Sequence, residues 1–387
     1  MINPFDFKFQ LQVTAWCLLL AGAAPAAPLY KPFDEPPHNY FQRVPQDRFS
    51  QLMATNPQLD TSGELPLLLS LLEKLDIPVS SQLLVFSATS LQSGLINPGN
   101  PRAIYFNSDT SVGFVPSGRL EIASLDPEAG MVFHIFDRLN PTQGLPKFVR
   151  SDRCMNCHAD TPSKHLPGLV VGSVAVNNIG GSLDNYRSEE IGHMVPLEQR
   201  FGGWHLTGGI TLPLNHANVI SVLNGDTMTT IPNPPGRTCD LRRYPLPTSD
   251  ILPHLIHEHQ AGFLNRVVES IYLARENKTE RMAEFSKEFA AYITFQKEAV
   301  LPVGGIIGDP TYTRVFQESG PTSGRLLREL DLKTRIFKHR CSFLLLTKSW
   351  QAVPPLLRKQ IYTELKRLLP AASPIRAALQ ANLSDWQ

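Results

Sequence analysis

The chain has 387 residues, of which 42% are hydrophobic and 18% charged, with a formal net charge of +1. This hydrophobic share supports a sizeable core and excludes wholesale disorder, while the near-neutral balance gives no general attraction to nucleic acid. Proline occurs 33 times, well above the usual share of about 5%, so we expect long connections between elements. The composition also excludes a coiled coil, a membrane bundle and a collagen.

The N-terminus has the pattern of a secretory signal peptide. Residues 11–27 read LQVTAWCLLLAGAAPAA, a short apolar run followed by small residues. We therefore predict a signal peptide over residues 1–27, with cleavage near residues 24–27. A retained anchor is the alternative, but the apolar run is shorter than the roughly 20 residues that span a bilayer. The mature protein is expected to be periplasmic or otherwise exported, without a stable membrane span.

Residues 28–150 form the first predicted region. Residues 28–60 are rich in Pro, Asn and Gln and indicate an extended arm. Apolar spacing predicts a helix over residues 65–77 that ends before Pro78. Short β-rich runs then alternate with Gly and Pro turns, which predicts a small antiparallel sheet. These runs cover residues 83–88, 103–107, 112–116, 120–125 and 131–136.

Residues 151–387 form the second region. Residues 151–250 are mostly loop by propensity, and helical patterns follow from there to the C-terminus. Ser249 is the expected N-cap of the first of these helices. The helices are predicted over residues 250–276, 281–299, 324–330, 354–369 and 374–383.

The motif that carries chemistry is Cys154-Met-Asn-Cys157-His158. Two thiols three residues apart on one tight turn can each add to a vinyl group of a porphyrin, and the adjacent imidazole can bind the iron. One such motif predicts one covalent haem c, held by Cys154 and Cys157 with His158 as the proximal ligand. A structural zinc site, which needs two further ligands, and a redox dithiol are the alternatives.

Several longer segments resemble a family of large exported mono-haem cytochrome c proteins of environmental Gram-negative bacteria. The resemblance covers nearly the whole mature chain and implies haem c and electron transfer, but no substrate. One departure is that the His-Met-Gly-Asn pattern of the family is met here by residues 216–219, His-Ala-Asn-Val, which lack the methionine. The segments are RCMNCH (153–158), PGLVVGSV (167–174), FGGWHLTG (201–208), NPRAIYFN (100–107), SDILPHLIHEHQ (249–260) and GRLLRELDLKTRIFKHRCSFLLL (324–346).

The sixth iron ligand is predicted to be His259. It lies on the apolar stripe of the helix over residues 250–276, seven residues after Leu252 and four before Phe263. A buried imidazole needs a partner, and iron is one such partner. A core histidine bonded to protein is the plainer reading. Other candidates for the ligand are His216, Met194, Met228 and another histidine, and an open position is also possible.

Trp204 is a further candidate for haem binding, because the glycines around it would let the backbone approach a porphyrin; a core Trp is the alternative. Arg153 or Arg200 can pair with a haem propionate, although a solvated arginine is the simpler interpretation. Cys239 and Cys341 are left over, either as a disulfide or as two buried thiols.

Together these features predict an α+β protein, with a mainly helical cytochrome c-like haem domain over residues 151–387. A small antiparallel sheet lies upstream in residues 28–150, and the loops are long and rich in Pro and Gly. The expected function is haem binding and electron transfer with a redox partner protein that the sequence does not identify, and no nucleic acid. The alternative is a haem enzyme or sensor, peroxidase-like or gas-binding, with an open sixth position; no catalytic residue is assigned.

Overall fold

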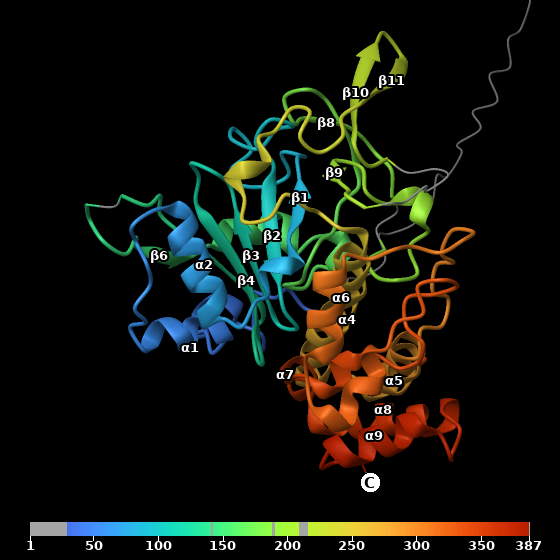
Figure 1. Ribbon diagram of the computed structural model, residues 1–387. Coiled ribbons are helices and arrows are strands. Elements are labelled where there is room, and N and C mark those ends of the chain that lie inside the picture. The colour runs from blue at the N-terminus through green and yellow to red at the C-terminus, as the bar shows by residue number, and fades with distance from the viewer. Residues whose placement is uncertain (1–28, 141, 188–189, 209–215, 387) are drawn as a thin grey trace, which may run out of the picture.

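A seven-stranded antiparallel sheet organises the molecule (Figure 1). The computed structural model describes residues 29–140, 142–187, 190–208 and 216–386. The strand order is β6-β5-β4-β3-β2-β1-β9, so the chain meanders across the sheet and a distant strand closes one edge. The strands are β1 Leu83–Val85, β2 Arg102–Phe106, β3 Thr110–Phe114, β4 Leu120–Asp126, β5 Gly130–Phe136, β6 Phe148–Arg150 and β9 Trp204–His205.

Two small two-stranded sheets lie outside the main one. The first pairs β7 (Val174–Val176) with β8 (Ser182–Asn185), and the second pairs β10 (Val219–Asn224) with β11 (Thr227–Pro232). The β10–β11 hairpin projects from the body of the protein at the top of Figure 1.

Helices occupy both flanks of the sheet and the C-terminal third of the chain. The longest, α4, has Asp250 as its N-cap, and this carboxylate accepts a hydrogen bond from the Leu252 N–H at 3.0 Å. The helices are α1 Arg48–Ala54, α2 Glu64–Lys74, α3 Met155–His158, α4 Ile251–Arg275, α5 Thr279–Ile293, α6 Pro310–Glu318, α7 Lys348–Gln351, α8 Pro355–Leu368 and α9 Pro374–Asn382.

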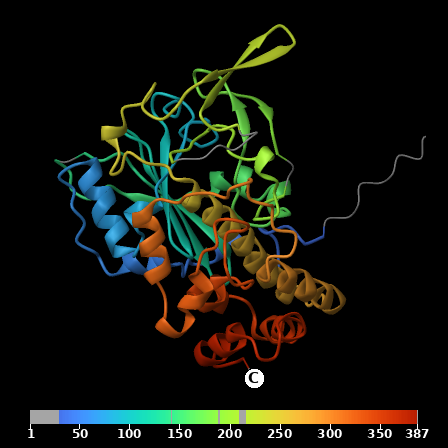
Figure 2. The ribbon, with the colours of Figure 1, turned by 45° about the vertical axis from the view of Figure 1, so that its right-hand side comes forward.

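The two faces of the sheet are covered by different parts of the chain (Figure 2). One face packs against α1 and α2 and forms a core with side chains such as Leu84, Tyr105 and Ile122. The opposite face, which we call the α4 face, contributes to a larger core that α4 and the C-terminal helices share. Alternation along the strands explains this division, because successive side chains point to opposite sides.

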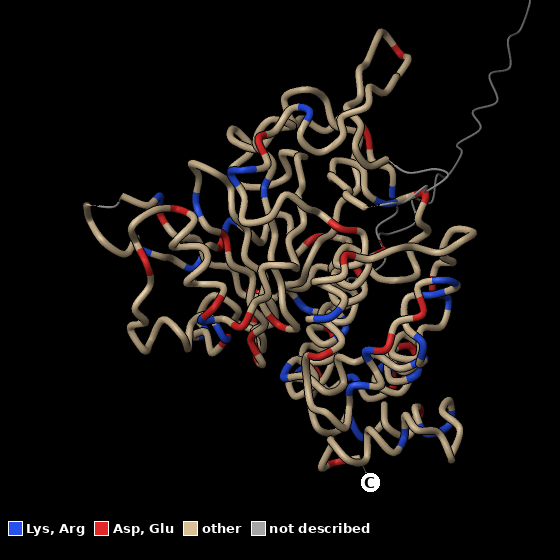
Figure 3. Tube along the Cα trace, viewed as in Figure 1, with Lys and Arg blue, Asp and Glu red and all other residues tan. Residues whose placement is uncertain are grey.

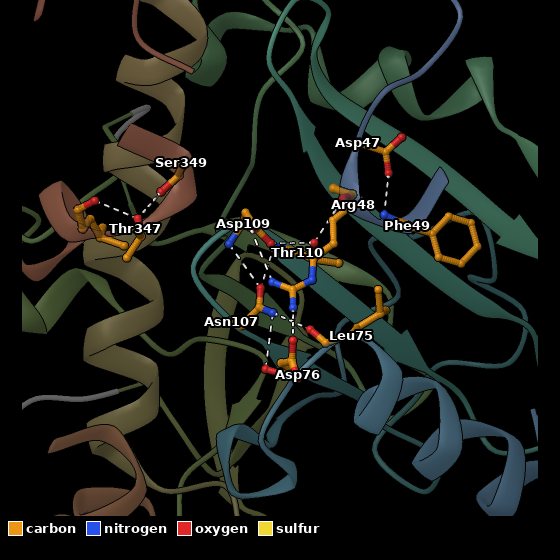
Figure 4. Close-up of polar contacts among 12 residues, drawn as sticks. Asp47, Arg48, Phe49, Leu75, Asp76, Asn107, Asp109, Thr110, Thr347 and Ser349 are labelled. Carbon is orange, nitrogen blue, oxygen red and sulfur yellow. Dashed lines mark hydrogen bonds and ion pairs between the residues drawn. The ribbon is translucent and has the colours of Figure 1, made fainter. Parts of the chain in front are cut away.

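Polar contacts fix α1 and α2 against the end of the sheet (Figure 4). Arg48 at the start of α1 pairs with Asp76 and lies 3.8 Å from the Asp109 carboxylate. The Asn107 side-chain amide donates to the Leu75 carbonyl at 2.8 Å and so holds the end of α2. The β2–β3 turn therefore supports both helices.

The expected antiparallel sheet and the helices near residues 65–77, 250–276, 354–369 and 374–383 are confirmed. The fold class is wrong, because the structure is not a mainly helical cytochrome c-like domain with a minor sheet. It is 36% helical and 16% strand and is organised around seven strands. The edge strand β9 comes from a segment with loop propensity, and its pairing with β1 depends on a contact between residues far apart in sequence.

Three local expectations also need correction. Asp250 rather than Ser249 caps α4; the Ser249 hydroxyl instead donates to the His205 carbonyl at 2.7 Å. The expected extended arm contains helix α1. The expected helix over residues 324–330 is a 3-10 helix, Thr322–Arg328.

One core crosses the expected boundary between residues 150 and 151. Leu83 and Phe106 of the sheet belong to the same cluster of buried side chains as Leu255 and Val267 of α4. This shared core places the segment that carries the Cys-x-x-Cys-His motif against the sheet.

Acidic and basic residues are interspersed along the trace (Figure 3). Across the part of the chain that the structure describes, no helix combines the length and apolarity needed to cross a bilayer. The expected signal peptide, residues 1–27, lies outside the described residues.

Asp47 provides a test of how α1 is attached to the sheet. Its buried carboxylate accepts from the backbone N–H groups of Phe49 and Ser50 and lies 3.2 Å from His134 Nε2 on β5. We expect Asp47→Ala to lower the free energy of unfolding by about 1–2 kcal/mol through loss of the cap, with a further loss because His134 is left without its carboxylate partner. Urea unfolding followed by far-UV circular dichroism measures this difference.

Asp47→Asn is the matched control, since an amide oxygen still caps the helix. Its destabilisation should be smaller than that of the alanine variant. Equal losses for both variants would show that the cap does not hold α1.

Candidate haem-attachment site

The Cys-x-x-Cys-His motif lies on a short turn that follows the edge strand β6. A 3-10 helix, Asp152–Cys154, leads directly into α3, Met155–His158. The Ser151 N–H donates to the Phe133 carbonyl at 2.8 Å and ties this turn to β5. Cys154 is partly buried, Cys157 is exposed, and neither forms a disulfide. Burial raises the pKa of the Cys154 thiol. Both thiols therefore lie on one turn, and neither is tied up in a disulfide.

His158 is held in one orientation by a backbone carbonyl. Its Nδ1 donates to the Gly168 carbonyl at 3.0 Å, and the Gly168 N–H in turn donates to the His158 carbonyl at 2.8 Å. Metal-binding histidines characteristically donate one ring N–H in this way, which leaves the other nitrogen as the ligand. Burial lowers the pKa of His158 to about 4, so the imidazole is neutral at pH 7. No hydrogen bond joins Nε2 to any residue that the structure describes.

The loop after His158 is clamped between the sheet and α4. Asn265 of α4 accepts from the Leu169 N–H at 2.7 Å and donates to the Leu169 carbonyl at 2.9 Å. Gly168 has no room for a side chain, because a Cβ there would lie 2.7 Å from the Asn265 side-chain oxygen. The His158 ring lies 4.2 Å from the Phe133 ring of β5, centroid to centroid. The motif thus lies on the α4 face of the sheet.

Trp204 lies on β9 and lines a narrow recess beside the start of α4. Its indole N–H donates to the Gly172 carbonyl at 2.8 Å, and its ring meets His254 edge-on with centroids 5.1 Å apart. We call this space the polar recess. Its lining includes Arg187, Arg200, Trp204, His254, His257 and Glu258.

Charges in the polar recess are only partly compensated. Arg187 and Glu258 form a buried ion pair with two contacts of 3.0 Å. Arg200 is 3% exposed and donates to the carbonyls of His193 and Val195, but its Nη1 has no partner among the described residues. Burial lowers the pKa of Arg200. The Arg200 guanidinium is therefore a buried cation with one N–H group unpaired within the described residues.

His259 lies in a different environment from His158. It is fully buried on α4, and both ring nitrogens already have protein partners. Nδ1 lies 2.8 Å from His193 Nδ1, and Nε2 lies 2.8 Å from the Ser342 hydroxyl. Burial lowers the pKa of His259 to about 3. His259 is thus a core histidine bonded to protein, which was the alternative to an iron ligand, and neither of its ring nitrogens is left to bind iron.

The other candidates are dispersed. His216 stacks on Tyr186 with ring centroids 3.5 Å apart, and Met228 lies on the projecting β10–β11 hairpin. Met194 is partly buried at the margin of the larger core, and Arg153 is exposed. Within the described residues, none of these four has a hydrogen bond, ion pair or ring contact with His158.

Cys239 and Cys341 are both buried and free. The Cys239 sulfur lies 3.8 Å from His205 Nε2, and burial raises the pKa of the Cys341 thiol far above its usual range. The structure therefore has two buried thiols where the sequence also allowed a disulfide.

A zinc site at the two motif cysteines would need further donors close by. Within residues 29–386, apart from the gaps given above, no three or more His, Cys, Asp or Glu side chains are grouped to hold a metal ion. A c-type haem has no such need, because the porphyrin supplies four donors and the protein adds one on each side. The described side chains therefore do not by themselves form a tetrahedral zinc site at the two cysteines.

Comparison of the chain with models of known protein families, with curated proteins and with solved structures gave no match. The resemblance to exported mono-haem cytochromes therefore stays a prediction.

His257 is the residue that the sequence reasoning passed over. It lies outside the apolar stripe that singled out His259, yet it is only 8% exposed. A signal was present: His257 and Glu258 follow His254 by three and four positions, and residues at these spacings share one side of a helix. That side faces the polar recess.

The free state of Cys239 and Cys341 can be checked in the exported protein. Alkylation in native buffer should leave both unmodified, because neither sulfur is accessible and thiolate is the reactive form. Alkylation in denaturant without reductant should label both, as counted by peptide mass spectrometry. Labelling that requires prior reduction would reveal a disulfide and contradict the structure.

Proposed function

We propose that this protein is an exported c-type cytochrome that carries one covalently attached haem and transfers electrons. The observation that carries the proposal is the arrangement of the motif. Two free thiols lie on one turn beside an imidazole whose Nδ1 is fixed by the Gly168 carbonyl and whose Nε2 has no described partner. This is the donor set that a c-type haem requires.

The surroundings of the motif also fit a porphyrin. Cys154, Ala123 and Ile104 are partly buried apolar residues at the margin of the larger core. A porphyrin covering this margin would bury apolar area that is now partly exposed.

In this proposal Cys154 and Cys157 tether the haem and His158 binds its iron. A c-type haem supplies one-electron chemistry. The Gly168 carbonyl holds the imidazole in the orientation and tautomer that ligation needs. The apolar N-terminal segment, residues 11–27, supports export to a compartment where such haems are attached.

The test is production of the full chain in a bacterium with haem c maturation machinery. Intact mass and haem staining of a denaturing gel should both report one covalent haem, and the purified protein should be reversibly reduced by dithionite. Cys154→Ser combined with Cys157→Ser should abolish the stain, because neither thioether can form. Cys239→Ser is the matched control and should keep it.

A wild-type protein that is exported, folded and free of covalent haem would overturn the proposal. Equal haem staining in the double variant would do so as well.

A further inference from the structure

At the centre of the α4 face, the two middle strands β3 and β4 carry three small residues, and the flanking strands β2 and β5 carry large aromatic side chains. Cross-strand pairing sets Phe106, Ser111, Ala123 and Phe133 side by side over β2, β3, β4 and β5. In the neighbouring row Gly113 of β3 pairs with Glu121 of β4, whose carboxylate forms an ion pair of 3.0 Å with Arg102 of β2. We call Ser111, Gly113 and Ala123 the small-residue strip. Paired residues share a face of the sheet, so the bulky rings of β2 and β5 lie on either side of this strip.

Two histidines lie against those bulky rings. His158 is 4.2 Å from Phe133, and His257 is 4.8 Å from Phe106, measured between ring centroids. Three strand spacings of about 4.8 Å separate the two phenylalanines, about 14 Å in all. His158 and His257 therefore lie against the two ends of one row of side chains, with the small-residue strip between those ends.

His257 is a buried polar side chain without a partner. It is 8% exposed, it lines the polar recess, and it makes no hydrogen bond with any described residue. The two neighbouring histidines of α4 differ in this respect. His254 Nε2 lies 3.0 Å from the Ser249 hydroxyl, and His259 has protein partners at both nitrogens. The described part of the protein engages neither ring nitrogen of His257, so both are available to a ligand.

The same helix positions both histidines. Asn265 anchors the loop that orients His158, and it lies eight residues after His257 on α4, which is about 12 Å along the helix axis. The Arg187–Glu258 ion pair fixes the helix next to His257. His257 and the His158 loop are thus held on one rigid element.

We propose that His257 is the sixth ligand of the haem iron, opposite His158. This inference rests on the proposed function, since it concerns the other face of the same haem. It makes the site six-coordinate with two imidazoles, which favours electron transfer over binding of a gas or peroxide.

The test uses the exported holoprotein and its visible and electron paramagnetic resonance spectra. The wild-type protein should be low-spin in both oxidation states, and its reduced form should not bind carbon monoxide. His257→Ala should keep its covalent haem, become high-spin and gain carbon monoxide binding, seen as a shift of the Soret band, and added imidazole should restore the low-spin spectrum. His216→Ala is the control and should match the wild type.

His257→Met keeps a side chain that can bind iron and covers the case in which the alanine variant does not fold. It should give the spectrum of mixed histidine and methionine ligation. Low-spin wild-type spectra that remain unchanged in His257→Ala or His257→Met would overturn the assignment, and so would a wild-type protein that is high-spin. Absence of covalent haem in the wild type is a different result, because it removes the proposed function itself.

Discussion

Burial of both faces of one antiparallel sheet is the constraint on which the rest of this structure depends. The face with Leu84, Tyr105 and Ile122 is closed by α1 and α2, which arise just before the sheet in the chain. The α4 face is closed by segments from the second half of the chain. The Cys-x-x-Cys-His turn lies on this second face, so the candidate site is assembled from both halves of the sequence.

This arrangement gives each residue of the motif a separate environment. Cys157 is exposed and Cys154 is partly buried, while His158 rests on Phe133 and is fixed by the Gly168 carbonyl. The orientation of one imidazole depends on a glycine that lets α4 approach, because a side chain at Gly168 would collide with Asn265. The orientation of the His158 imidazole therefore depends on how closely α4 packs against the loop at Gly168.

The contrast between His257 and His259 follows from the same packing. Both lie on α4 and both are buried, but the core surrounds His259 with the partners it needs, namely His193 and Ser342. His257 faces the polar recess and has no such partner. A histidine inside a packed core is satisfied by protein, whereas one beside an incompletely filled space is available to a ligand. The placement of His257 thereby gives the proposed cytochrome a second imidazole on the α4 face.

The sequence by itself determined the local features. Short β-rich runs bounded by Gly and Pro turns located the strands around residues 103–136, helical spacing located α4, and the spacing of Cys154, Cys157 and His158 identified the motif. Tertiary structure alone decided that β9 closes the sheet, that His259 has protein partners and that His257 lies over Phe106. Periodicity shows which side of a helix is apolar, but it does not show which neighbours meet that side. Those neighbours come from strand pairing and loop packing between residues far apart in the chain, and such contacts leave no local pattern in the sequence.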